Sequence, residues 1–186
     1  MKWSALAVSL FAASGLASPM FADLDVYTLR LSSTTKSLNG KYLGVNGTLV
    51  GVYKETSVVK FIAVPSSEKP SFVELHTYPI GKVDRALALV GKQGLLDFTD
   101  VTEPSSVTVP KGTTCDWTSF SLGEKTLKYG GSKAGGWVAF PTGKDATEWS
   151  VKWKDASAIT IQNYMPVDVV YETTKKTETT EFGTSD

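Results

Sequence analysis

Beyond residue 23, hydrophobic and polar positions alternate over short runs and give little sign of a helical repeat. In 25–31 the apolar side chains Tyr27, Leu29 and Leu31 occupy every second position. Alternate residues of a strand share one face, so we also expect Ile159 and Ile161 to share a face. The pattern predicts an all-β chain with strands at 25–31, 41–45, 48–53, 58–64, 71–78, 85–90, 95–99, 106–109, 118–122, 126–129, 137–140, 148–153, 158–163 and 168–171.

Three stretches of this pattern resemble one another and suggest an internal repeat. Residues 42–52, 89–98 and 129–140 each read as strand, glycine-containing hairpin turn and second strand, the second strands starting at Leu49, Leu95 and Trp137. An apolar strand follows each unit, at 59–64, 117–122 and 149–153. This is the plan of a β-trefoil, in which six strands close a barrel and three hairpins cap it. We predict a β-trefoil-like barrel, with a β-sandwich as the alternative.

The two ends of the chain differ in composition from the middle. Lys2 is followed by apolar or small residues at 3–16, with no further charge before Asp23. This run is too short to span a membrane and predicts a signal peptide at 1–17, cleaved after Ala17. We therefore expect a secreted protein, extracellular or in a cell wall, with one β domain at 23–172. The Thr-rich, charged segment 173–186 is predicted to be a disordered tail.

Charge and cysteine content narrow the classes of partner. The 186 residues carry 19 basic and 19 acidic side chains, with no basic stripe for nucleic acid. No other segment is apolar and long enough to contact a membrane after signal cleavage. Cys115 is the only cysteine, so an internal disulfide cannot form. It is expected to be a buried small side chain, or alternatively to bridge to another chain.

Catalytic and metal-binding patterns are not found. His76 is the only histidine, and it has no Gly-x-Ser-x-Gly partner and no ligand-like spacing to Cys115. We expect it on the solvated face of a strand. We predict no enzyme, no catalytic residue, no metal and no cofactor. Paired carboxylates of a glycosidase would have to come from residues that the sequence does not bring together: Asp97, Asp100, Glu103, Asp116, Glu148 and Asp155.

Two features suggest contact with carbohydrate. Asn46-Gly47-Thr48 is an N-glycosylation sequon and also a favoured hairpin turn, so Asn46 is the predicted glycosylation site. Aromatic faces stack on sugar rings. The candidate glycan-stacking residues are Trp117, Trp137, Trp149 and Trp153. The alternative role of these tryptophans is to fill the core. Asn163 and Tyr164 are further polar groups near a strand end.

Several short motifs resemble small secreted fungal cell-wall proteins, a group that includes the phialide-associated cell-wall protein and IgE-binding allergens. The motifs are residues 29–33, Leu-Asn-Gly-Lys-Tyr-Leu-Gly at 38–44, Gly-Leu-Leu-Asp-Phe-Thr at 94–99 and Trp-Val-Ala-Phe-Pro at 137–141. Phe140 stands where that family has a cysteine. The resemblance implies a wall-associated, non-catalytic protein of a filamentous fungus and carries over no catalytic residue.

The leading hypothesis is therefore a non-catalytic, secreted, cell-wall-associated structural protein of a fungus. The first alternative is a carbohydrate-binding module or lectin, and the second is a secreted inhibitor or effector. The expected partner is a cell-wall polysaccharide or glycan.

Overall fold

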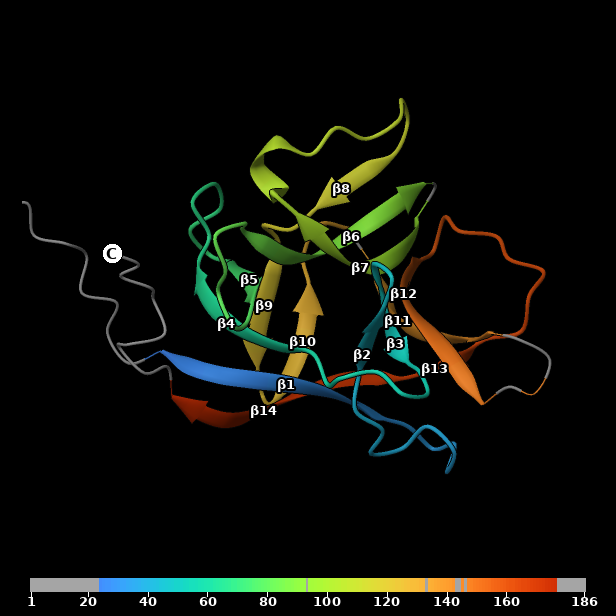
Figure 1. The fold of residues 1–186 in the computed structure, drawn as a ribbon. Coiled ribbons are helices and arrows are strands. Elements are labelled where there is room, and N and C mark those ends of the chain that lie inside the picture. Colours follow the sequence, from blue (N-terminus) through green and yellow to red (C-terminus); the bar gives the residue numbers. More distant parts are fainter. Residues whose placement is uncertain (1–23, 93, 133, 143–144, 146, 177–186) are drawn as a thin grey trace, which may run out of the picture.

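The computed structural model describes residues 24–92, 94–132, 134–142, 145 and 147–176, and the predicted signal peptide at 1–17 lies outside them. Within these residues the chain is all-β, with one short 3₁₀ helix, η1 (Pro104–Ser106). The strands form a closed barrel with outer strands beside it (Figure 1).

Six antiparallel strands close the barrel. In order round the ring they are β1 (Asp25–Ser32), β4 (Lys60–Pro65), β5 (Val73–Thr77), β9 (Phe120–Gly123), β10 (Thr126–Tyr129) and β14 (Asp168–Lys176). The β1–β14 ladder runs the whole length of β1. Two seams are narrow, because β5 meets β9 only at Val73 and Phe120, and β10 meets β14 only at Thr126 and Val170.

Three hairpins lie beside the barrel. They are β2 (Gly44–Asn46) with β3 (Leu49–Val52), β6 (Arg85–Lys92) with β7 (Leu95–Thr102), and β11 (Gly135–Thr142) with β12 (Glu148–Asp155). The second strands of the hairpins, β3, β7 and β12, each pair with the other two. Two shorter strands extend the hairpins: β8 (Thr114–Asp116) pairs with β6, and β13 (Met165–Pro166) pairs with β11.

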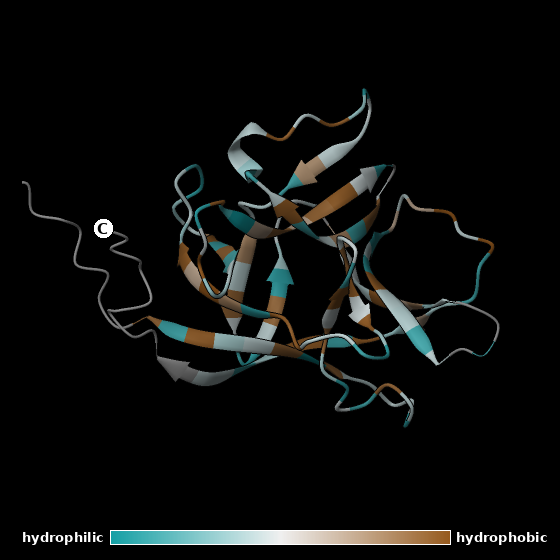
Figure 2. Cartoon of the chain, viewed as in Figure 1, coloured by the Kyte–Doolittle hydropathy of each residue, from teal (hydrophilic) through white to brown (hydrophobic). Residues whose placement is uncertain are grey.

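The main hydrophobic core lies between barrel and hairpins and joins them. Phe98 of β7 is fully buried, and its ring centroid lies 6.1 Å from that of Phe120 in the barrel and 5.0 Å from that of Trp137 in β11. Alternation places these side chains inward, and Figure 2 shows hydrophobic and hydrophilic residues alternating along β1. Burial of these aromatic side chains together with the aliphatic residues of the cluster stabilises a chain that cannot form an internal disulfide.

Most predicted strands are confirmed, but the third hairpin is wrong. Residues 129–140 do not form a hairpin, because Tyr129 ends β10, which pairs with β9, whereas β11 pairs with β12. The second strand of this hairpin therefore begins at Glu148 and not at Trp137. Gly130 and Gly131 lie in the connection from the barrel to the hairpin, and Gly135 and Gly136 begin β11, so the glycines that suggested a hairpin turn lie on both sides of a strand start.

Two predicted strands are not strands, and one boundary moves. Of residues 106–109, Ser106 ends η1 and 107–109 are irregular, and 158–163 form a loop. The predicted tail begins too early, because 173–176 belong to β14 and Thr173 pairs with Tyr27. Thr174 Oγ1 also donates to the Val26 carbonyl at 3.0 Å. The barrel's need for a partner to β1 outweighs the polar composition of 173–176, while 177–186 lie outside the described residues.

The contact between β3 and β12 gives a test of the hairpin triangle. A Cβ on Gly51 would clash with the Trp149 carbonyl oxygen and the Tyr53 ring, so β12 would have to move. We predict that Gly51→Ala lowers the free energy of unfolding by about 1–3 kcal/mol, measured by urea denaturation with tryptophan fluorescence.

The matched control is Gly136→Ala on β11, where an added Cβ meets no atom within 4 Å. This variant should keep the wild-type midpoint. Equal midpoints for the two variants would show that the β3–β12 contact is not tight.

Candidate functional site

The site begins at the narrow seam between β10 and β14. Beyond the Thr126–Val170 pair the two strands separate, and the Trp137 indole reaches the seam from β11. Its Nε1 donates to the Leu127 carbonyl at 2.7 Å. Val167 N in turn donates to the Trp137 carbonyl at 3.1 Å. The indole and β11 thus supply hydrogen bonds at the point where β10 and β14 part, which a buried backbone requires.

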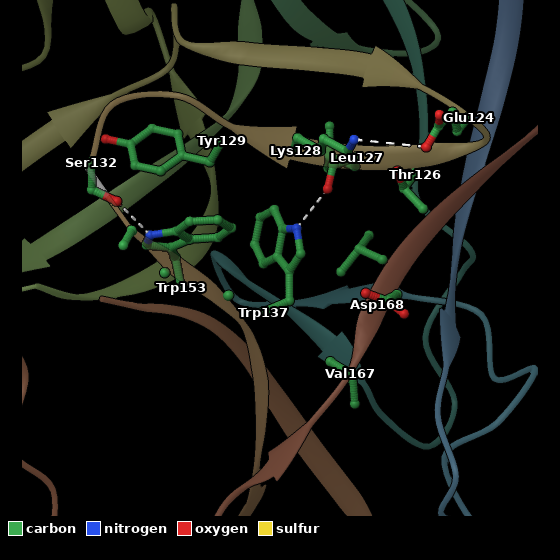
Figure 3. A pocket seen from close by; sticks show the side chains of 14 residues that line it. Glu124, Thr126, Leu127, Lys128, Tyr129, Ser132, Trp137, Trp153, Val167 and Asp168 are labelled. Carbon is green, nitrogen blue, oxygen red and sulfur yellow. Dashed lines mark hydrogen bonds and ion pairs between the residues drawn. The ribbon is translucent and has the colours of Figure 1, made fainter. Parts of the chain in front are cut away.

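A cavity of about 540 Å³ opens at this point. Figure 3 shows the indoles of Trp137 and Trp153 side by side at its inner wall, with Tyr129 and Ser132 at one end and Asp168 at the other. The Trp137 and Trp153 rings meet edge to face with centroids 5.4 Å apart. Trp153 Nε1 donates to Ser132 Oγ at 2.8 Å, so its polar edge is satisfied within the wall. The wall is therefore a fixed aromatic surface with polar groups around it.

The mouth of the cavity carries three charged side chains, Glu124, Lys128 and Asp168. Lys128 Nζ lies 4.0 Å from Glu124 Oε2, and both side chains are largely exposed. An exposed pair of this kind contributes little to stability. The charged groups are therefore free to exchange their contacts for those of a ligand. The cavity therefore combines a volume in the range of small-molecule sites with an aromatic wall and a charged rim.

The structure assigns the predicted stacking residues mainly to the core. Trp137, Trp149 and Trp153 are 5–7% exposed, so these three fit the alternative expectation that the indoles fill the interior. Only edges of Trp137 and Trp153 reach the cavity, because their faces pack against aromatic neighbours. Trp117 is half-buried and its ring lies 6.1 Å from that of His76. Stacking of a sugar across a full indole face does not fit the three buried rings.

A second polar cluster surrounds Asp116 at the end of β8. Its carboxylate accepts hydrogen bonds from Thr118 N at 3.0 Å, Ser119 Oγ at 2.6 Å and Tyr129 OH at 3.1 Å, with Lys69 Nζ at 3.4 Å. Burial alone would raise the pKa of Asp116, but these hydrogen bonds and Lys69 outweigh burial and lower the pKa below its usual value. The cluster fixes the β8–β9 connection to β10, so its role is structural.

The tyrosine and thiol near this cluster stay protonated. Burial, followed by the Asp116 charge, raises the pKa of Tyr129, so its hydroxyl remains a donor. Burial, again followed by Asp116, raises the pKa of the Cys115 thiol. Cys115 is partly buried on β8, close to its expected role as a small packed side chain.

Five of the six candidate carboxylates have hydrogen-bond or ion-pair partners of their own in the structure. Asp97 contacts Lys152 Nζ at 2.7 Å, Asp100 pairs with Arg85, and Glu148 accepts from Lys54 N at 2.9 Å. Asp155 accepts from Ser157, and Asp116 belongs to the cluster above. Ion pairs and turn contacts of this kind are typical of carboxylates that stabilise a fold.

His76 lies on β5, as a strand residue, but its ring is not on a solvated face. The side chain is only 16% exposed and bridges two carboxylates, with Nδ1 2.7 Å from Asp84 Oδ1 and Nε2 3.3 Å from Glu74 Oε2. The Trp117 ring lies beside it in an edge-to-face arrangement. The described residues contain no group of three or more His, Cys, Asp or Glu side chains that could hold a metal ion.

Comparison with family models, with curated proteins and with solved structures gives no match. In the part of the chain that the structure describes, no helix is long and apolar enough to cross a membrane.

Sequence reasoning missed the polar side chains of the cavity, namely Ser132, Glu124, Lys128 and Asp168. They are ordinary surface residues in the pattern, and what brings them together is the separation of β10 from β14. The sequence signals for the cavity were Trp137 and Trp153, which the sequence analysis selected as aromatic residues without the seam that Trp137 enters.

The Asp116 cluster generates a pH-dependent prediction. Because the pKa of Asp116 is lower in the folded chain than the unfolded value of about 3.9, its stabilising contribution is present above that value and is lost as pH falls through the folded pKa. Asp116→Asn should lower the free energy of unfolding at pH 7 by about 2–3 kcal/mol. The difference from wild type should narrow below about pH 4, as measured by urea denaturation at several pH values.

Glu68→Gln, at an exposed carboxyl, is the control and should unfold like the wild type across this range. A constant gap between Asp116→Asn and wild type from pH 7 down to pH 2.5 would contradict the role given to the ionised carboxylate.

Proposed function

We propose that this chain is a secreted, non-catalytic β-trefoil protein that associates with the fungal cell wall by binding carbohydrate in the β10–β14 cavity. The observation that carries the proposal is that cavity, with its aromatic wall and charged rim. The fold, the pocket chemistry and the sequence resemblance each support one part of it.

The strand order supports the trefoil assignment. The chain runs from barrel to hairpin and back to barrel three times: from β1 through β2 and β3 to β4, from β5 through β6 and β7 to β9, and from β10 through β11 and β12 to β14. The mutual pairing of β3, β7 and β12 gives the hairpins an approximate threefold arrangement. β8 and β13 are then insertions in the second and third units. A trefoil scaffold by itself does not specify an activity.

The cavity supports a carbohydrate ligand better than a purely apolar one. A sugar presents C–H groups and hydroxyls together, and the cavity presents the edges of Trp137 and Trp153 beside Ser132, Lys128 and Asp168. Carboxylates accept from hydroxyls and an ammonium group donates to them. Because the cavity is open and of moderate size, we infer that it binds one end or a short stretch of a glycan. The many glycan chains of a cell wall would then keep the protein attached to the wall.

The resemblance carries over no catalytic residue, which favours binding without turnover. The resemblance to small secreted cell-wall proteins and the predicted signal peptide support the location. We expect the mature protein to remain with the wall fraction after export and to be released by competing soluble glycan.

The carbohydrate proposal is tested by pull-down on insoluble chitin, β-1,3-glucan and mannan. The double variant Lys128→Ala/Asp168→Ala should lose at least tenfold in retention on the polysaccharide that binds the wild type, because each charged hydrogen bond contributes about a factor of ten. Both side chains lie at the rim, so folding should be unchanged in a thermal melt.

The matched control is Lys111→Ala/Glu68→Ala, which removes the same two charges from exposed positions that do not line the cavity. Control retention should equal that of wild type. Wild-type protein that binds none of the three polysaccharides, or equal losses for both double variants, would contradict the proposed site.

The proposed export gives a separate prediction at Asn46. This residue is exposed at the β2–β3 turn, where Gly47 has a positive φ of 64°, so the sequon is accessible. Protein secreted from a fungal host should lose mass on treatment with peptide-N-glycosidase, and Asn46→Gln should show no such loss. An unmodified wild-type protein in the culture medium would refute glycosylation at this turn.

A further inference from the structure

A second hollow, of about 280 Å³, lies next to the β10–β14 cavity. Trp153 of β12 lines only the cavity, whereas Lys154, the next residue of the strand, lines only the second hollow. Because successive strand residues point to opposite faces, the two hollows lie on opposite faces of the β11–β12 hairpin. They meet at the start of β11, where they share four wall residues: Ala134, Gly135, Gly136 and Trp137.

The start of β11 has a free edge where the two hollows meet. On one side, residues 135–136 pair with β12. On the other side, β13 pairs with β11 only at Val138 and Ala139, and Val167 N donates to the Trp137 carbonyl. In the part of the chain that the structure describes, no strand therefore covers the second edge of 135–136. Backbone groups at an uncovered edge are available to the hydroxyl groups of a ligand.

This free edge carries no side chains. A Cβ on Gly135 would clash with Trp153 Nε1 and with the Lys154 carbonyl oxygen, so packing requires a glycine there. A Cβ on Gly136 would meet no atom within 4 Å, so this residue faces open space. A glycine inside a strand often marks a place where a ligand approaches the backbone closely. The two glycines leave a passage through which a narrow chain can run from one hollow to the other.

Tyr164 gives the second hollow an aromatic surface. Of the two polar residues selected near a strand end, Tyr164 lines this hollow, whereas Asn163 is exposed and lines neither hollow. The Tyr164 ring is partly exposed and packs on Phe140 with centroids 5.6 Å apart. Lys154 Nζ lies 5.8 Å from the Tyr164 centroid. A held, partly exposed ring can contact the C–H groups of a sugar, and the ammonium group beside it can donate to hydroxyls.

A linear glycan fits the joined hollows better than an added peptide strand. Strands are usually three residues or longer, and the free edge of β11 offers only 135–136 before β13 begins to pair. Charges of both signs line the two hollows, which favours a neutral polymer over a strongly acidic or basic one. These charged residues are Glu124, Lys128, Lys154, Asp155 and Asp168.

We infer that a neutral, linear polysaccharide crosses the start of β11, with one part of its chain in the β10–β14 cavity and the next part beside Tyr164. The inference rests on the proposed carbohydrate function and adds the class of glycan, a chain bound along its length and not by its end. Gly136 and Tyr164 are then specificity-determining residues. Gly136 leaves the passage open, and Tyr164 contacts the second part of the chain.

The test is how affinity depends on chain length, measured by calorimetry with the disaccharide and the hexasaccharide of chitin, β-1,3-glucan and mannan. In the series that the full secreted chain binds, the hexasaccharide should bind about tenfold more tightly, because it adds the hydrogen bonds of the second hollow. Gly136→Gln, which blocks the passage, and Tyr164→Ala should each bring hexasaccharide affinity close to that of the disaccharide. Disaccharide affinity should not change. Gly136→Gln should also melt like the wild type, because position 136 faces open space.

Gly81→Gln is the matched control, because a Cβ there meets only Val83 backbone atoms at 3.9 Å and the residue lines neither hollow. It should bind both oligosaccharides like the wild type. Equal wild-type affinities for the two lengths, or an unchanged hexasaccharide affinity in Gly136→Gln, would overturn the crossing and leave the proposed glycan cavity in place. An equal loss at both lengths in Gly136→Gln would also overturn it, since Gly136 would then belong to a single site. A wild-type protein that binds none of the oligosaccharides or polysaccharides would overturn the proposed function as well.

Discussion

Closure of the barrel by β1 and β14 is the constraint on which the other features depend. The ladder extends over the whole of β1 and joins the two ends of the described chain, so folding of the barrel requires contacts between its most distant parts. With no internal disulfide, this ladder and the aromatic core supply the cross-chain connections. On its other edge β14 pairs with β10 at only one position, and the Trp137 indole enters the seam beside that pair.

Local pattern predicted what depends on neighbours along the chain and missed what depends on neighbours in space. Strand alternation placed β1 and β10 correctly, since side-chain period is a local property. The glycines before Trp137 resembled a hairpin turn, and only the pairing partners of β10 and β11 distinguish the two. Residues 158–163 alternate as a strand does, but no sheet edge lies beside them. The cavity follows from a seam whose width no local pattern encodes.

The contacts of the buried polar side chains also depend on neighbours in space. Asp116 and His76 are single residues in sequence, and each acquires its role from groups contributed by other elements: Asp116 from Ser119, Tyr129 and Lys69, and His76 from Glu74 and Asp84. Their saturation by neutral donors and opposite charges assigns them to the framework that holds the barrel and the hairpins in place.

The β1–β14 register makes the domain suitable for circular permutation. Asp25 lies opposite Lys176, so the two ends of the described domain emerge side by side. A short flexible linker could join them with little cost in loop entropy, and the chain could then be opened at another surface turn without disturbing the order of strands round the ring. The ends of the domain lie within the ring of strands, at the β1–β14 ladder. A circularly permuted chain should therefore be able to form the same ring of strands.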